Sequence, residues 1–132
     1  MKATLHTDGG SRGNPGPAAI GYVLRVEDQE AIFHGEAIGE TTNNQAEYQA
    51  LLAGLGRARE EGVAELECFL DSELVVKQLK GEYRVKDQDL KPHFEAIKKL
   101  AAGLTSISYT HVKRDKNKEA DKLVNQALDS LG

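Results

Sequence analysis

Four acidic residues stand where a strand or a helix is expected to begin or end. Asp8 ends the strand-like ATLHTD, Asp71 follows the apolar LECFL, and Glu47 and Asp121 lie near the starts of two helix-like segments. Carboxylates that converge without matching cations repel one another and raise their own pKa values. A divalent metal ion, or a pair of them, would remove that cost and create a site for phosphoryl chemistry. Oxygen ligands favour Mg²⁺, with Mn²⁺ as a substitute.

Asp8 and Asp71 each have a structural interpretation as well. An aspartate before Gly-Gly, as Asp8 is, suits a turn. Asp71 precedes Ser72 and a short helical pattern, which suits a helix N-cap. The carboxyl ends of strands in open α/β sheets are also where ligand crevices form. If the first strand lies beside residues 65–70, the two aspartates are cross-strand neighbours.

Glu47 and Asp121 face the apolar side of their helical patterns. Glu47 shares its helical face with Leu51 and Leu55. The spacing from Asn44 to Glu47 also fits a capping box, in which Glu47 reaches back to the first-turn amides. A helix-dipole role would explain an acid near a helix N-terminus, as Asp121 is, but would not explain why it faces inward.

The periodicity of apolar residues predicts three strands, a helix, and then strands alternating with helices. The predicted strands are 3–8, 18–26, 30–39, 65–70 and 105–112, and the predicted helices run from Asn44 to Gly62 and over 72–81, 89–103 and 118–131. Asn43 or Asn44 can cap the first helix. The order βββαβααβα indicates an α/β fold with a mixed sheet. The length suits one domain spanning 1–132.

Composition limits the class of protein. The net charge of −4 is unevenly distributed: residues 1–76 hold 5 Lys and Arg against 13 Asp and Glu, whereas residues 77–122 hold 12 against 7. The basic half could meet an anion, although solvated helices explain it equally well. The single cysteine, Cys68, excludes an internal disulfide and is expected to be a small buried apolar residue. Without an apolar leader or membrane span, we expect a cytoplasmic monomer.

Four segments together resemble a known family. TDGGSRGNPGPAAIGYVL, TTNNQAEYQALLAGL, FLDSELVVKQL and NKEADKLVNQAL, in this order, resemble type 1 ribonuclease H, in particular the short archaeal and bacterial forms without a basic protrusion. The resemblance implies a ribonuclease H-like fold, a five-stranded mixed sheet with helices on both faces. It implies an endonuclease that hydrolyses the RNA strand of RNA/DNA hybrids with two metal ions, leaves 5′-phosphate and 3′-hydroxyl ends, and has little sequence preference.

The resemblance also assigns residues. Its catalytic and metal-binding acids are Asp8, Glu47, Asp71 and Asp121, with Asp8 bridging both ions. Its candidates for substrate binding lie in the glycine-rich loop, the TTNN segment and the last loop: Gly13, Asn14, Thr42, Asn43, Asn44, Gln45 and Arg114. Thr42 would lie near a DNA phosphate, and most of the others near ribose 2′-hydroxyls. Those hydroxyls are what distinguish RNA from DNA in a wide, shallow minor groove.

The chain departs from the better-known family members in three places. The loop HVKRDKNKEAD has Arg114 and Asp115 where many members carry a histidine; Arg114 is expected to make an auxiliary contact, and His111 a structural one. The segment KGEYRVKDQDLKPHF joins two helices directly where some relatives insert the protrusion, which predicts modest affinity and a small salt slope. Glu73 is an acid where a neutral residue is common, which would lower activity or change the metal optimum.

Two alternatives remain open on the sequence. The specificity could be broader and include double-stranded RNA. The chain could also be a non-catalytic nucleic-acid-binding module with the same fold, although a binder gains nothing from four converging carboxylates.

Overall fold

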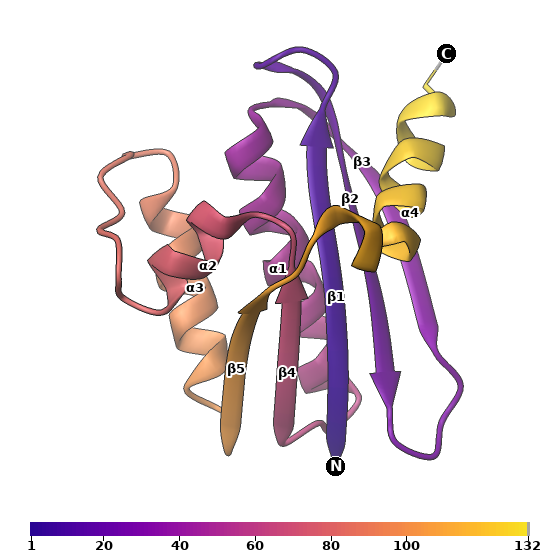
Figure 1. The fold of residues 1–132 in the computed structure, drawn as a ribbon, viewed down its shortest axis with the longest axis vertical. Coiled ribbons are helices and arrows are strands. Elements are labelled where there is room, and N and C mark those ends of the chain that lie inside the picture. The colour runs from indigo at the N-terminus through magenta and orange to yellow at the C-terminus, as the bar shows by residue number, and fades with distance from the viewer. Residues whose placement is uncertain (132) are drawn as a thin grey trace.

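A five-stranded mixed sheet forms the centre of the computed structural model, which describes residues 1–131 (Figure 1). The strand order is β3-β2-β1-β4-β5, with β2 antiparallel to both β1 and β3 and with β4 parallel to both β1 and β5. The strands are β1 (Lys2–Ser11), β2 (Gly16–Val26), β3 (Ile32–Thr41), β4 (Glu65–Leu70) and β5 (Ser106–His111). The predicted five-stranded mixed sheet is confirmed, and β1 lies at its centre beside β4.

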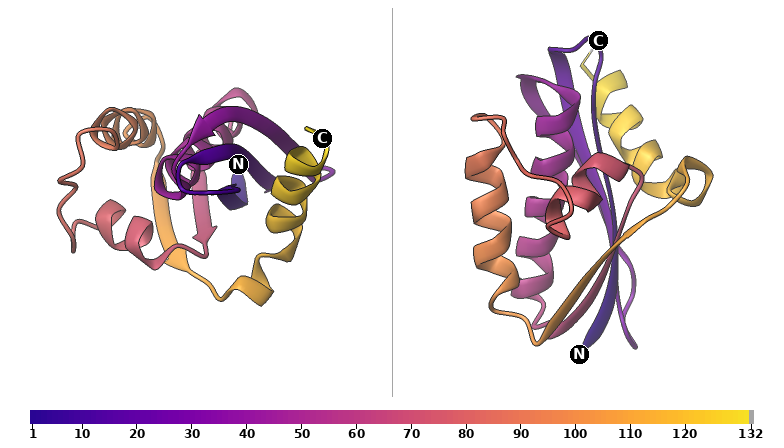
Figure 2. Two further views of the ribbon diagram at one scale, coloured as in Figure 1. Left: turned by 90° about the horizontal axis from the view of Figure 1, so that it is seen from above. Right: turned by 60° about the vertical axis from the view of Figure 1, so that its left-hand side comes forward.

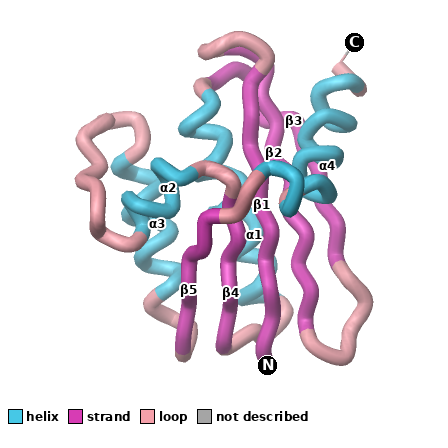
Figure 3. The backbone as a smooth tube through the Cα atoms, in the orientation of Figure 1, coloured by secondary structure: helices cyan, strands magenta, loops and turns pink. Residues whose placement is uncertain are grey.

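The helices follow the predicted order. They are α1 (Asn43–Glu60), α2 (Glu73–Leu79), α3 (Lys91–Ala101) and α4 (Lys118–Asp129). A short 3₁₀ helix, η1 (Arg114–Lys116), precedes α4 and was not predicted. Between α2 and α3 the chain forms a loop without a helix or strand, as predicted (Figure 3). Among residues 1–131, none of the helices combines the length and the apolar character needed to cross a bilayer.

The first strand is longer than its apolar alternation predicted. Gly9, Gly10 and Ser11 continue the pairing of β1 with β2, opposite residues 18–20. Asp8 therefore lies inside a central strand, opposite Gly21, and its interpretation as a turn residue is wrong. The extension carries the glycine-rich segment past the carboxyl end of β4, so that it forms one wall above that edge.

Two hydrophobic layers lie on opposite faces of the sheet. Helices α1, α2 and α3 cover one face over the large core, and α4 covers the other over a small cluster of Ala19, Val124 and Leu128 (Figure 2). Close approach of α4 requires a glycine below it, since a Cβ on Gly21 would lie 2.6 Å from the Ala120 carbonyl oxygen. Cys68 is fully buried in the large core, as predicted.

The cap of α1 differs from the prediction. Thr42, rather than Asn43 or Asn44, is the N-cap, and its hydroxyl accepts a hydrogen bond from the Gln45 N–H at 3.2 Å. The side chain of Asn43 instead accepts from the Ser11 N–H at 2.8 Å. Strand β3 runs to Thr41 and the helix begins at Asn43, so both asparagines lie inside its first turn and neither can be the N-cap. The helix ends at Glu60, before Gly62, as predicted.

Candidate active site

Asp8 and Asp71 lie side by side at the carboxyl end of the parallel strands. The register pairs Thr7 with Leu70, so the next residue of each chain segment is an aspartate. The predicted neighbours are confirmed. Asp71 is not an N-cap: Ser72 caps α2, and its hydroxyl accepts from the Val75 N–H at 3.3 Å. The Asp71 carboxylate is therefore free of a helix-capping role.

Glu47 reaches the same place from α1, on the opposite face of the sheet from α4. Its Oε1 accepts a hydrogen bond from the Gly9 N–H at 2.7 Å, so the capping-box interpretation is wrong. Its other oxygen, Oε2, is buried and has no hydrogen-bond partner within residues 1–131. Ligand atoms of Asp8, Glu47 and Asp71 all lie within 4.8 Å of one another. These three oxygens form a group that could hold a metal ion.

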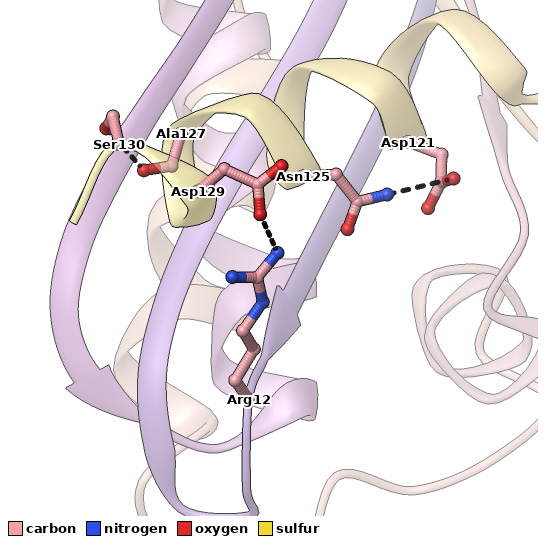
Figure 4. A network of polar contacts seen from close by, with 6 residues as sticks. All are labelled: Arg12, Asp121, Asn125, Ala127, Asp129 and Ser130. Atoms are coloured by element: carbon pink, nitrogen blue, oxygen red, sulfur yellow. Dashed lines mark hydrogen bonds and ion pairs between the residues drawn. The ribbon is translucent and has the colours of Figure 1, made fainter. Parts of the chain in front are cut away.

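Asp121 comes from the first turn of α4 and lies outside this group of three. Its Oδ2 accepts a hydrogen bond from Asn125 Nδ2 at 3.3 Å, and Arg12 and Asp129 form an ion pair at 2.5 Å further along the helix (Figure 4). The ion pair joins α4 to the glycine-rich segment. Asp121 lines the same cleft as the other three acids.

A cleft of about 480 Å³ contains all four acids. Of the predicted substrate-binding residues, Asn43, Asn44 and Arg114 line it, whereas Gly13, Asn14, Thr42 and Gln45 do not. Its other lining residues are Gly9, Gly10, Ser11, Arg12, Ser72, Val124, Asn125 and Leu128. Asn14 lies at the rim, where its Oδ1 accepts from the Asn43 N–H at 2.9 Å. The glycine-rich loop and the start of α1 are thus joined directly.

Burial and mutual repulsion perturb two of the acids. Burial, together with the charges of Asp71 and Asp121, raises the pKa of Asp8 from 3.8 to about 7. Burial and the neighbouring Asp8 charge raise the pKa of Glu47 well above its usual value. No Lys or Arg forms an ion pair with Asp8, Glu47 or Asp71 among the described residues. The cluster therefore favours any cation that can reach it.

Comparison with known proteins gives the family. A family model described as reverse transcriptase-like matches residues 6–127. Ribonuclease HI of Halobacterium salinarum is 47% identical over 123 residues, which are 92% of this chain and 62% of that protein. The crystal structure of RNase H1 from that organism has a TM-score of 0.93 at 44% identity, and the match covers 98% of this chain and 99% of that one. The chain belongs to the type 1 ribonuclease H family.

Another similar structure, also of a ribonuclease H, contains bound nucleic acid. LC11-RNase H1 in complex with an RNA/DNA hybrid has a TM-score of 0.91 at 41% identity, with 98% of each chain covered. Several curated relatives are longer than this chain: it spans 36% of three mycobacterial proteins that are 42% identical to it, and 62% of the Halobacterium ribonuclease HI.

The charged side chains in and beside the loop before α4 lie in different surroundings. Arg114, in η1, lines the cleft, whereas Asp115 faces a different hollow beside His6. His111 ends β5, with its Nδ1 3.8 Å from a carboxylate oxygen of Glu73. Glu73 also contacts Lys77 Nζ at 3.3 Å, so its charge is partly paired. Arg114 is therefore the basic side chain of this loop that the fold presents to the acids.

The raised pKa of Asp8 predicts how metal-free stability depends on pH. Between the ordinary pKa of 3.8 and the folded value of about 7, the folded protein retains a proton that the unfolded chain has lost. The free energy of unfolding should therefore fall as the pH rises through this window. Divalent cations compete with that proton, so Mg²⁺ should raise the melting temperature more at about pH 8 than at about pH 5. Thermal melts in EDTA and in Mg²⁺ measure both effects; equal stabilisation by Mg²⁺ at both pH values would contradict this assignment.

Proposed function

We propose that this ribonuclease H is an endonuclease that hydrolyses the RNA strand of RNA/DNA hybrids, with 1–132 as one catalytic domain. The observation that carries the proposal is the convergence of Asp8, Glu47 and Asp71 on one point without a paired Lys or Arg among residues 1–131, with Asp121 in the same cleft. The hybrid bound to LC11-RNase H1 supports the choice of substrate. The scissile phosphate would enter the cleft above the carboxyl ends of β1 and β4.

The acidic cluster fits a divalent metal ion. It offers only carboxylate oxygens, and the buried Oε2 of Glu47 lacks the partner that a buried polar atom normally has. Asp8, Glu47 and Asp71 would hold one Mg²⁺, and Asp8 with Asp121 a second; Mn²⁺ could replace either. Such ions stabilise charge on a transferring phosphoryl group and lower the pKa of water.

The fold itself holds the acids in place. The Gly9 N–H donates to one oxygen of Glu47, and the other oxygen has no hydrogen-bond partner among the described residues. The uncompensated negative charge of the acids would repel a bare phosphodiester, so substrate entry depends on cations. The guanidinium of Arg114, at the cleft wall, would contact the anionic backbone of the substrate.

Residues at the rim of the cleft would contact the ribose 2′-hydroxyls of the RNA strand. Asn43 and Asn44 line the cleft, and Gly13, Asn14 and Gln45 belong to the two segments that meet at its rim. The Thr42 hydroxyl accepts from the Gln45 N–H, which leaves its own proton free to donate to a DNA phosphate. Contacts to sugar and phosphate, without contacts to base edges, would give little sequence preference. The loop between α2 and α3 adds few phosphate contacts, so affinity would be modest.

A cleavage assay tests the proposal. Purified protein with Mg²⁺ should cut the labelled RNA strand of a hybrid to 5′-phosphate products, and EDTA should stop the reaction. Duplex RNA and duplex DNA run in parallel define the specificity, and cleavage of duplex RNA at a comparable rate would broaden it. Hybrid binding that is insensitive to EDTA, with no cleavage in Mg²⁺ or Mn²⁺, would overturn the proposal and identify a non-catalytic binding module.

A further inference from the structure

Asn117 is a buried polar residue whose side chain joins the two strands that lead to Asp8 and Asp71. It is 2% exposed and directly precedes α4. Its Nδ2 donates to the Thr7 carbonyl oxygen at 2.8 Å and to Asp71 Oδ2 at 3.1 Å. Thr7 precedes Asp8 within β1, and Asp71 directly follows β4, so one amide group connects the two strands beside these two acids.

The backbone of Asn117 also holds the start of α4, the helix that carries Asp121. Its carbonyl oxygen accepts a hydrogen bond from the Asp121 N–H at 3.1 Å and so closes the first turn of α4. Its own N–H donates to the Arg114 carbonyl oxygen at 3.0 Å, which ties the η1 turn to the same point. Asn117 therefore contacts β1, the end of β4 and α4 where Asp8, Asp71 and Asp121 project.

Helix capping alone does not explain this arrangement. An asparagine before a helix normally uses its side-chain oxygen to accept from an N–H of the first turn. Here the side chain makes no capping bond, and the buried Oδ1 has no partner among the described residues. A buried acceptor without a partner lowers stability. The side chain has been turned away from the helix that it precedes and toward the acids.

We propose that Asn117 is a positioning residue that orients the Asp71 carboxylate for a divalent cation. An amide donor fixes one carboxylate oxygen and leaves the other available, without adding a positive charge that would compete with the metal ion. The inference rests on the proposed function, because it assumes that the acids bind metal. The proposal adds to the site a residue whose side chain contacts Asp71 directly and also contacts Thr7, the residue before Asp8.

The test is metal affinity in the absence of substrate. We expect Asn117→Ala to weaken binding of Mn²⁺, measured by calorimetry, by roughly 10- to 100-fold, which is the usual effect of removing a partner of a metal ligand. Cleavage by this variant should be restored by raising the Mg²⁺ concentration, with KM for the hybrid unchanged. Gln78→Ala is the matched control, since Gln78 is a buried amide that accepts from the Tyr48 hydroxyl at 2.5 Å, away from the acids. It should lose stability but keep the Mn²⁺ affinity.

Asn117→Ser provides a second variant, because serine suits a helix N-cap and removes both side-chain bonds of the amide. A folded variant of either kind that binds Mn²⁺ within twofold of the wild-type affinity would overturn the proposal. Failure of both variants to fold would also overturn it, since Asn117 would then serve the fold alone. A wild-type protein that binds no Mn²⁺ would instead contradict the proposed function and remove this inference with it.

Discussion

Asp8→Asn is expected to abolish cleavage while making the metal-free protein more stable. Asp8 projects from the central strand next to both Glu47 and Asp71. The neutral amide of an asparagine in its place would bind a cation poorly and would not balance the charge of the cation. A loss of at least about 1,000-fold in kcat is expected, as for other residues that act as one catalytic unit. Cleavage rates measured on a labelled hybrid over a series of Mg²⁺ concentrations give this loss, which extra Mg²⁺ should not restore.

The same variant should melt at a higher temperature in EDTA. At about pH 8 the folded protein holds Asp8 as a carboxylate against a pKa of about 7, a cost that a neutral amide avoids. The expected gain is about 1–2 kcal/mol in the free energy of unfolding, less than the full shift implies because neighbouring acids relax. Asp28→Asn is the matched control: Asp28 lies in the turn after β2 with a φ of 63°, which asparagine tolerates. It should change neither quantity. Wild-type cleavage by Asp8→Asn would exclude the four-acid mechanism.

Gly9→Ala is expected to produce the largest loss of stability. A Cβ at this position would lie 2.2 Å from the Ala46 carbonyl oxygen and 2.6 Å from the Glu47 backbone nitrogen. Both atoms belong to the backbone of α1, so the helix must move away from β1 to admit one methyl group. The expected cost is about 3 kcal/mol, at the upper end for overpacking. Because the Gly9 N–H also holds Glu47 Oε1, the movement should reduce cleavage together with stability.

Gly56→Ala, a substitution inside α1 itself, is expected to have the opposite effect on stability. A Cβ on Gly56 has no neighbour within 4 Å, and alanine favours the helical conformation by about 0.5–1 kcal/mol over glycine. This variant should therefore melt at a higher temperature and cleave normally. Urea unfolding of both variants measures the two free energies. A Gly9→Ala protein as stable as the wild type would show that α1 need not approach β1 so closely.

The sequence predicted the fold and the acids better than the hydrogen bonds around them. Alternating apolar residues predict the strands. Four motifs in a fixed order predict the topology and the positions of the acids in it. The cap of α1 illustrates what this reasoning misses. Thr42, Asn43 and Asn44 can all cap a helix, and the choice among them depends on where β3 stops pairing with β2.

Asn117 could not be recognised as a buried residue from its surroundings in the sequence. It stands in DKNKEAD, between charged residues that are typical of an exposed loop. Its burial depends on the η1 turn, which folds the loop back toward β1, and on a partner 110 positions earlier in the chain. The elongation of β1 was missed for a related reason, because pairing with β2 overrides the low strand preference of Gly9 and Gly10.

The separation of partners along the chain has a consequence for synthesis. The bond from Asn117 to Thr7 and the ion pair from Arg12 to Asp129 join segments that are 110 and 117 positions apart. A nascent chain thus contains Asp8, Glu47 and Asp71 well before it contains Asn117, which donates to Asp71, or the helix that carries Asp121. An unfinished copy of this chain therefore carries an incomplete set of acids. The four acids can line one cleft only once α4 has packed beside β1.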